Sequence, residues 1–305
     1  MKKIEYISHK YIDFDKWDTC VSNSINGLIY GYSFYLNALC NEDWDAIIVG
    51  DYDAIFPLPF KKKYGLFYLY QPYFCQQLGI MSKLPINQIL VKNCIKKIPF
   101  KFFKVNIQLN YANKVFFRKK YKIQERTNYI LKLSPTYDEI FANFSKDAKK
   151  NLNKIKPTQY TVSNFVDEEA IISLFFETYS QFYGKQLHHK KYILNLLKKG
   201  IAFQKGFART IIDASTKEIW CMGYFFKSHN RIYYIIAAPT SLGKKNNASH
   251  ILINEIIKEF AGQNIYLDFE GSDLPNVAQF YKKFSPEKEI YYQLSGNVLL
   301  RLMDY

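Results

Sequence analysis

Three strand-like segments follow one another closely in the second half of the sequence, and this run limits the chain to folds with a largely antiparallel sheet. The segments are Gly206–Ile212, Ile219–Phe226 and Arg231–Ala237, and two short polar turns connect them. Periodicity around them predicts further strands at 128–133, 160–165, 265–269 and 289–294, and helices at 137–144, 146–156, 167–179, 188–199, 249–261 and 276–284. This order predicts an α/β (α+β) fold in which helices flank a mixed, mostly antiparallel, twisted sheet.

Residues 1–126 show a looser version of the same mixture. Helical periodicity occurs at 13–21, 33–40 and 86–98, with Asp13 and Ser33 as expected N-caps, and strand-like runs occur at 46–50, 54–60, 66–70 and 102–109. No low-complexity linker interrupts the 305 residues, a length that suits about two domains of ~150 residues. We therefore predict two domains, at residues 1–126 and 127–305.

Composition excludes several classes of protein. Apolar residues make up 48% of the chain, which excludes wholesale disorder, and the longest apolar run, Ile219–Phe226, has eight residues where a membrane-spanning helix needs ~20. Lys2 and Lys3 are not followed by the apolar stretch of a signal peptide. The five cysteines lie far apart, and no Cys/His cluster has metal-ligand spacing. We expect a cytoplasmic protein with reduced thiols, no transmembrane segment and no metal site.

The chain is strongly basic. It has 42 lysines and arginines against 27 aspartates and glutamates, a net charge of +15, and only five of the cations are arginines. A lysine excess attracts polyanions such as RNA, coenzyme A, nucleotides or an acidic carrier protein. Base readout favours arginine, so we do not expect a DNA-binding protein. A general bias of the composition toward lysine would explain the charge equally well.

A strand end provides the first group of candidate site residues. The strand at 265–269 delivers Asp268, Glu270, Gly271 and Ser272 to its C-terminal edge, where ligands of open α/β sheets gather. Two carboxylates two residues apart lie on one strand face, where repulsion favours protonation of one of them. Glu270 or Asp268 could then act as a general base toward an amine. Alternatively, these carboxylates cap the next helix together with Ser272 and Asp273.

A glycine- and lysine-rich loop before the helix at 249–261 provides the second group. Backbone N–H groups at a helix N-terminus bind phosphates and carboxylates, and nearby lysines add positive charge. The candidate residues for binding an anionic cofactor or co-substrate are Gly243, Lys244, Lys245, Asn246, Asn247 and Ser249. The alternative is a plain surface loop with Ser249 as the helix N-cap.

A lysine-rich helix provides the third group. Lys146, Lys149 and Lys150 mostly share one face of the helix at 146–156, because residues three and four apart are neighbours on a helix. This face could bind an anionic substrate. A solvated lysine face is the alternative.

These stretches, taken in order, resemble the Fem family of peptidoglycan-bridge aminoacyltransferases and the related acetyltransferase-like branch of the GNAT superfamily. The matching segments are Tyr30–Leu36, Phe56–Phe60, Tyr70–Gly79, Phe144–Lys154, Gly243–Ile257, Leu267–Ser272 and Phe280–Phe284. The resemblance covers most of the chain and implies two tandem GNAT-like domains. It also implies transfer of an acyl or aminoacyl group from a thioester or ester donor to an amine.

The resemblance implies roles for further residues. Gln71, Tyr73, Gln76 and Gln77 would line the acceptor cleft of the first half, unless they form polar contacts between the domains. Lys282 or Lys283 would offset negative charge near the catalytic carboxylates. The implied co-substrate is acyl-CoA or aminoacyl-tRNA, with no tightly bound cofactor. The implied acceptor is a small-molecule or cell-wall-precursor amine.

Two hypotheses for function follow. The first is an acyltransferase in which Glu270 or Asp268 is the base, with no covalent intermediate, because no serine or cysteine has a nucleophile-elbow setting. In it, the loop at 240–247 opens where the sheet splays, within one substrate's length of both carboxylates. The second is a non-catalytic GNAT-like module that binds RNA, a nucleotide-linked sugar or a carrier protein. It is motivated by departures from the family patterns, which keep only Gly243 of the phosphate-binding glycines and have Tyr281 and Ser285 in place of the usual lysine and glycine.

Overall fold

The chain divides into two compact units. The computed structural model describes residues 2–115, 121–183, 189–271, 273 and 275–297. Unit 1 comprises Met1–Thr127 and Glu289–Tyr305, and unit 2 comprises Asn128–Lys288. The chain passes from unit 1 to unit 2 inside β7 (Lys122–Lys132) and returns inside β13 (Glu287–Asn297). The first crossing lies one residue beyond the boundary expected at 126/127, whereas the return had no counterpart in the sequence prediction.

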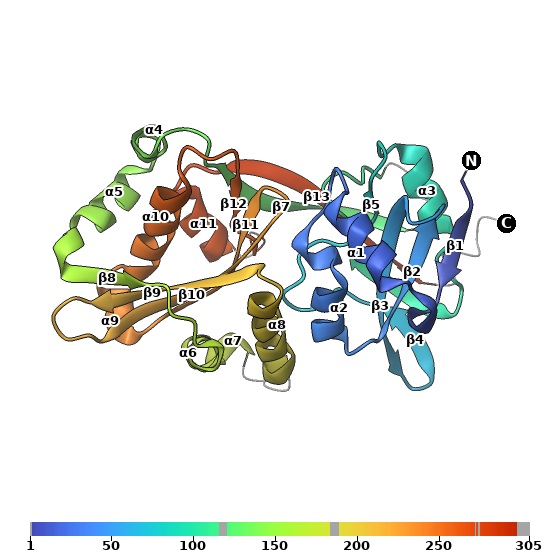
Figure 1. The fold of residues 1–305 in the computed structure, drawn as a ribbon, viewed down its shortest axis with the longest axis horizontal. Coiled ribbons are helices and arrows are strands. Elements are labelled where there is room, and N and C mark those ends of the chain that lie inside the picture. Colours follow the sequence, from blue (N-terminus) through green and yellow to red (C-terminus); the bar gives the residue numbers. More distant parts are fainter. Residues whose placement is uncertain (1, 116–120, 184–188, 272, 274, 298–305) are drawn as a thin grey trace. The chain divides into compact units, whose positions relative to one another are not determined.

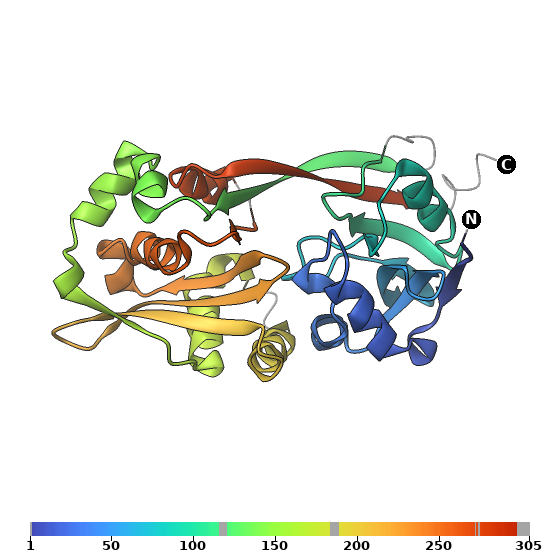
Figure 2. The ribbon, with the colours of Figure 1, turned by 45° about the horizontal axis from the view of Figure 1, so that its top comes forward.

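Unit 1 is a sheet with helices on both faces. Besides parts of β7 and β13, its strands are β1 (Ile4–Ile7), β2 (Trp44–Val49), β3 (Ala54–Lys63), β4 (Leu66–Leu69), β5 (Met81–Ser82) and β6 (Phe102–Gln108). Its helices are η1 (His9–Tyr11), α1 (Phe14–Ser22), η2 (Ile29–Gly31), α2 (Ser33–Cys40) and α3 (Gln88–Lys96). The strand order is β1-β2-β3-β4-β6-β13, with β5 beside β3. Helix α3 covers one face of the sheet and α1 and α2 cover the other (Figure 1, Figure 2).

Unit 2 has the same kind of layering. Its further strands are β8 (Tyr160–Ser163), β9 (Gly206–Asp213), β10 (Ile219–Ser228), β11 (Arg231–Pro239) and β12 (Tyr266–Asp268). Its helices are α4 (Tyr137–Ala142), α5 (Lys146–Asn153), η3 (Pro157–Gln159), α6 (Glu168–Thr178), α7 (Ser180–Tyr183), α8 (Lys190–Ala202), α9 (Ser241–Lys245), α10 (Ala248–Phe260) and α11 (Pro275–Lys282). The strand order is β7-β12-β11-β10-β9-β8. Helices α4, α5, α10 and α11 lie on one face of this sheet, and α6 and α8 lie on the other (Figure 1).

The two units repeat one topology. In unit 1 the antiparallel meander β2-β3-β4 is followed by α3 and by β6, which pairs parallel with β4. In unit 2 the antiparallel meander β9-β10-β11 is followed by α10 and by β12, which pairs parallel with β11. An antiparallel strand then flanks each of these parallel strands, β13 beside β6 and β7 beside β12. The predicted fold class, with helices flanking mixed and mostly antiparallel sheets, is confirmed.

Two helix starts differ from the sequence prediction. Ser33 is the first residue of α2 rather than its N-cap, and its hydroxyl donates to Asp18 at 2.6 Å. Ser249 lies inside α10, whose N-cap is Asn247 in the left-handed conformation (φ 52°). The loop expected at 239–247 also contains the short helix α9, because the Thr240 hydroxyl accepts the backbone N–H of Gly243 and so caps an extra turn. In the described part of the chain, no helix is long and apolar enough to cross a membrane.

Candidate functional site

The parallel strands of unit 2 pair over three residues and then separate. Arg231 to Tyr233 of β11 pair with the three residues of β12, Tyr233 opposite Asp268, and β12 ends there. The next residue, Phe269, donates its backbone N–H to the carbonyl of Tyr129 on β7 at 3.0 Å, while β11 continues to Pro239. The predicted adjacency of the three-strand meander and this strand is therefore present, and so is the point of separation.

Asp268 is held on three sides at the end of β12. Its Oδ2 accepts a 2.9 Å bond from the Arg231 guanidinium, and its Oδ1 accepts bonds from the Asn128 amide at 2.9 Å and from the Glu270 backbone N–H at 3.1 Å. The side chains of Asp268 and Arg231 are 1% and 8% exposed, so this ion pair is buried. A carboxylate engaged in this way positions the following turn rather than meeting an incoming amine.

Glu270 lies just beyond the strand in an unusual backbone conformation. Both Glu270 and Gly271 have φ 50°, in the left-handed region, and Glu270 is buried. The expectation that Asp268 and Glu270 share a strand face is wrong, because β12 ends at Asp268 and the chain turns. A non-glycine residue in this region costs of order 1–3 kcal/mol, and such strain clusters at functional sites. Ser272, which was expected in the same turn, lies outside the described residues.

Aromatic side chains of α11 pack beside this turn. The Tyr281 ring stacks on Phe269 at 4.9 Å and meets Tyr234 of β11 edge-on at 6.1 Å. The Nζ of Lys282 lies 5.7 Å from the Tyr129 ring centroid, so this predicted site residue lies near the end of β12. Ser285, at the position where the family has glycine, adopts φ 53°, a conformation that glycine takes at little cost.

The predicted anion-binding residues form a compact turn at the far end of β11. Gly243 is buried, and a Cβ placed there would lie 1.7 Å from the Trp220 carbonyl oxygen, so only glycine allows this contact. Backbone N–H groups of Gly243, Lys244, Asn246 and Asn247 already donate within the turn, the first to the Thr240 hydroxyl. The side chains of Lys244 and Lys245 are exposed. The turn therefore presents lysine charge rather than a cradle of free N–H groups.

This turn and Glu270 lie toward the same end of the parallel pair. Strand β11 runs from Tyr233, opposite Asp268, to Pro239. At ~3.3 Å per residue, the start of α9 is roughly 20 Å along the strand from Asp268. That the turn and Glu270 belong to one cleft stays a prediction.

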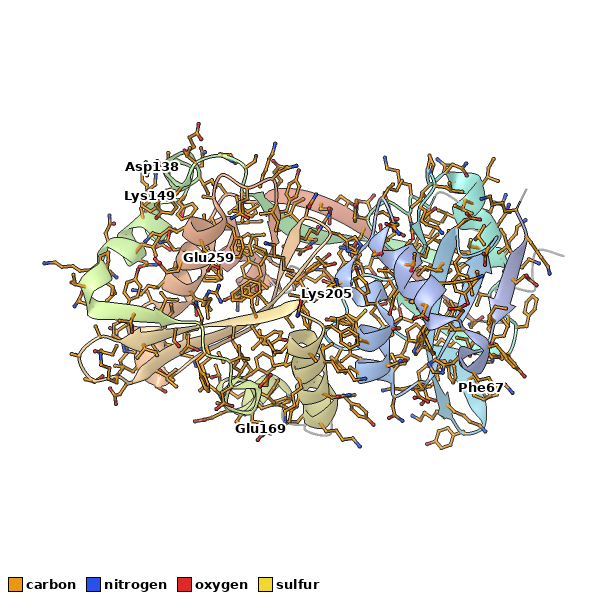
Figure 3. All side chains as sticks on the ribbon, in the orientation of Figure 1. Phe67, Asp138, Lys149, Glu169, Lys205 and Glu259 are labelled. Atoms are coloured by element: carbon orange, nitrogen blue, oxygen red, sulfur yellow. The ribbon has the colours of Figure 1, made fainter. Side chains whose placement is uncertain are left out.

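The lysines of α5 are partly engaged with neighbouring elements. The Nζ of Lys149 donates to the Ala142 carbonyl at 2.7 Å, at the C-terminus of α4 (Figure 3). Lys146 and Lys150 are exposed. Asp147 on the same helix pairs with Lys283 at 2.6 Å, which lowers the pKa of the Asp147 carboxyl. The helix is thus anchored to α11, with two of its three predicted lysines facing solvent.

The predicted acceptor-binding residues lie in unit 1, and two of them hold its backbone together. Gln71 donates to the Cys75 carbonyl at 2.6 Å and accepts from the Gln108 N–H at 2.9 Å. Gln77 is fully buried, accepts from the Tyr111 N–H at 2.8 Å and donates to Gln76 at 3.0 Å. Tyr73 is 44% exposed. The bonds of Gln71 and Gln77 are contacts within unit 1, so neither residue makes the contact between domains that was the alternative for them.

A buried histidine next to these elements had no place in the sequence prediction. His250 of α10 is 8% exposed, lies near the Asn151 amide at 3.3 Å and meets the Phe280 ring edge-on at 4.8 Å. Burial lowers the pKa of His250 to about 4, with a smaller contribution from Lys283 in the same direction. The imidazole is therefore neutral at pH 7, and it joins α5, α10 and α11.

We expect His250 to make unit 2 sensitive to acid. Its folded pKa of about 4 lies below the unfolded value of 6.5, so between these pH values only the unfolded state binds the proton. The free energy of unfolding should fall by about 2–3 kcal/mol as the pH drops from 7 to 4. Urea unfolding of wild type and His250→Gln at pH 7.5 and 4.5 isolates this contribution, because the other titrating groups are common to both. An equal pH dependence in the two proteins would contradict the assignment.

The described residues offer neither a metal site nor a reactive thiol. No group of three or more histidine, cysteine, aspartate or glutamate side chains in the described ranges is arranged to hold a metal ion. Burial raises the pKa of the Cys20 thiol to about 11 and that of Cys94 and Cys221 to about 12. These thiols are protonated at neutral pH and are poor nucleophiles.

Comparison with known proteins identifies the fold. No protein-family profile matches the sequence, and no curated protein is significantly similar to it in sequence. The crystal structure of FemX is similar at a TM-score of 0.64 and 12% identity, over 94% of this chain and 96% of that one. The structure of L-PGS from Bacillus licheniformis is similar at 0.55 and 12% identity, over 92% and 90% of the two chains. A tandem GNAT protein from the clavulanic acid biosynthesis pathway is similar at 0.52 and 9% identity, over 97% and 99%. The chain has a Fem-like, tandem GNAT-type fold, as the sequence resemblance implied.

Proposed function

We propose that this protein is an N-acyltransferase or aminoacyltransferase that moves an acyl group from a thioester or ester donor to an amine. One observation carries the proposal. Glu270 is buried and held in a left-handed conformation where β11 and β12 separate, and Asp268 fixes that turn by accepting the Glu270 N–H. The Fem-like, GNAT-type fold supports the same conclusion.

Glu270 would act as the general base. The acceptor amine loses a proton to the Glu270 carboxylate, directly or through one water, and attacks the donor carbonyl carbon. A C–N bond forms, the donor C–S or C–O bond breaks, and the leaving thiol or hydroxyl takes a proton. Asp268 is a positioning residue in this scheme. Direct transfer fits the chain because the Cys20, Cys94 and Cys221 thiols are buried and protonated at neutral pH.

The co-substrates would be an anionic donor and a neutral or cationic amine. Lys244 and Lys245 at the start of α10 attract the phosphates of acyl-CoA or aminoacyl-tRNA, and Lys146 and Lys150 add positive charge from α5. Lys282 would offset charge near the end of β12. In unit 1, Tyr73 and Gln76 stay candidates for contact with a small-molecule or cell-wall-precursor amine in the cytoplasm.

The first test is removal of the base. Glu270→Gln keeps the shape of the side chain and should lower turnover by ~100-fold or more, because a positioned base contributes that much. Release of free thiol from acetyl-CoA, and transfer from a charged tRNA, measured with a panel of amines, report the two donor classes. Glu169→Gln, on the exposed surface of α6 (Figure 3), is the matched control. Unchanged turnover in Glu270→Gln would remove this residue from the mechanism.

One observation favours the non-catalytic alternative. The N–H groups of Gly243, Lys244, Asn246 and Asn247 are already used within the turn, which therefore offers a phosphate only side-chain charge. Thermal shifts distinguish the two functions, since a ligand at 100 times its Kd stabilises by ~2.7 kcal/mol. Stabilisation by acetyl-CoA or coenzyme A supports the transferase. Stabilisation by RNA alone supports a binding module.

A further inference from the structure

Almost all of the net positive charge lies in one segment of unit 1. Residues 54–124 contain 14 lysines and arginines and no aspartate or glutamate, whereas the remaining residues have 28 cations against 27 acidic residues. The described part of this segment includes β3, β4, β5, α3 and β6. The chemistry proposed for unit 2 uses none of this charge.

The β3–β4 hairpin ends in a turn whose sequence does not serve folding. Lys63 pairs with Leu66, so Tyr64 and Gly65 form a two-residue connection, with φ 51° and 83°. Turns with two positive φ values prefer Asn-Gly or Asp-Gly, and tyrosine is unfavourable at the first of these positions. Tyr64 is nevertheless present, and it is 92% exposed. A large aromatic residue that the backbone disfavours and that packs little indicates a role outside the fold.

Further apolar and basic side chains lie at the same end of the sheet. Leu66 is 53% exposed beside the turn. Strands β4 and β6 are parallel with Phe67 opposite Phe102, so the segment leading into β6 lies next to the hairpin end (Figure 3 labels Phe67). That segment includes Lys97 and Phe100, which is 48% exposed. We define the tip surface as Lys62, Lys63, Tyr64, Leu66, Lys97 and Phe100.

We infer that the tip surface binds the surface of a membrane rich in anionic lipids. Tyrosine, leucine and phenylalanine at a protruding turn enter the boundary between headgroups and acyl chains, where tyrosine is especially favoured. Each lysine near an anionic leaflet adds to the affinity, and no acidic residue of this segment opposes it. Two kinds of signal, apolar insertion and basic charge, together give stable but reversible attachment.

The residue types favour lipid over RNA. Proteins that bind single-stranded RNA use aromatic rings and arginines on which bases stack. Here the exposed apolar set includes the aliphatic Leu66, which offers no stacking face, and the cations of the tip surface are all lysines. A convex turn also inserts into a bilayer more readily than it follows a nucleic-acid strand.

Vesicle binding by the full-length protein tests the inference. Sedimentation at 0.15 M salt, an ionic strength at which the Debye length is ~8 Å, should show binding to phosphatidylglycerol-containing vesicles and not to phosphatidylcholine alone. Tyr64→Asn should weaken binding by about tenfold while the melting temperature stays equal or rises, because asparagine suits the turn. Lys62→Gln with Lys63→Gln should weaken it by about 25-fold, at about fivefold for each lysine. The matched controls, expected to bind as wild type, are Tyr11→Asn, at a tyrosine 70% exposed in η1, and Lys154→Gln with Lys191→Gln, at exposed lysines of unit 2.

Three results would overturn the inference. One is equal binding to anionic and neutral vesicles, or to neither. A second is that the tip variants bind as tightly as the controls. The third is that the protein binds poly(U) RNA in a gel-shift assay, with the same dependence on Lys62 and Lys63, but no vesicles, which would assign the tip surface to nucleic acid. Because the readout is binding by unit 1 residues, it is independent of whether Glu270 is a base.

Discussion

Replacing Arg231 by methionine should lower the free energy of unfolding by about 3–5 kcal/mol. The substitution leaves the Asp268 carboxylate buried at 1% exposure with only the Asn128 amide and the Glu270 N–H as remaining partners among the bonds described above. Breaking a buried pair from one side strands an uncompensated charge, which is the reason for the large effect. Urea unfolding followed by circular dichroism measures the change.

The double variant Arg231→Met with Asp268→Asn separates charge from shape. Asparagine keeps an oxygen for the Asn128 and Glu270 donors but carries no charge, so this variant should lose about 1–2 kcal/mol, less than the single change. A single variant within about 1 kcal/mol of wild type would mean that Asp268 relies on other groups. The catalytic carboxylate would then have to be assigned afresh.

Replacing Gly243 by alanine should cost at least about 3 kcal/mol. The new Cβ would lie 1.7 Å from the Trp220 carbonyl oxygen and 2.5 Å from its carbonyl carbon. These are backbone atoms of β10 and cannot swing aside, so α9 must move off the strand. If Lys244 and Lys245 bind the donor, its affinity should fall together with the stability.

The neighbouring lysine provides the control for Gly243→Ala. Lys244→Ala removes an exposed side chain from the same short helix and should change the unfolding free energy by no more than ~0.5 kcal/mol. Thermal unfolding, with and without coenzyme A, measures both variants. Equal melting temperatures for the two would show that α9 is free to shift at no cost, contrary to the close packing of Gly243.

The sequence predicted the meander of unit 2 well because its signals are local. Gly206–Asp213, Ile219–Ser228 and Arg231–Pro239 are apolar runs separated by polar turns, and hairpin pairing follows from such a pattern without distant information. The helix starts were less certain, because a cap depends on a single backbone conformation. Asn247 rather than Ser249 begins α10, since asparagine tolerates the left-handed region.

The role of Asp268 could not be derived from spacing. Its partners Arg231 and Asn128 are 37 and 140 residues away in the sequence, so the ion pair exists only once β7, β11 and β12 are assembled. One signal was available. Arg231 is one of only five arginines and opens an otherwise apolar strand, and arginine is the preferred cation for buried ion pairs. An arginine in that position predicts a buried acid on the neighbouring strand.

The amide side chains of unit 1 show the limit of motif reasoning. Gln77 has no solvent exposure and Gln71 joins two separate backbone segments, which are structural tasks. A family motif preserves such residues as readily as it preserves a binding site, because both fix the same loop. His250 was missed for the opposite reason: a lone histidine in an amphipathic helix has no local pattern, and only the packing of α5 and α11 around it gives it a role.

The return of β13 to unit 1 sets an order of folding during synthesis. Residues 128–288 of unit 2 are contiguous, so this unit can form as soon as they leave the ribosome. Unit 1 begins earlier but lacks the strand that pairs with Lys104–Gln108 of β6 until the residues after Glu289 emerge. The usual N-to-C order of domain folding is thereby reversed, and an open strand edge waits on the nascent chain. The exposed Lys104 on that edge is the kind of charged residue that keeps such edges from pairing with other chains.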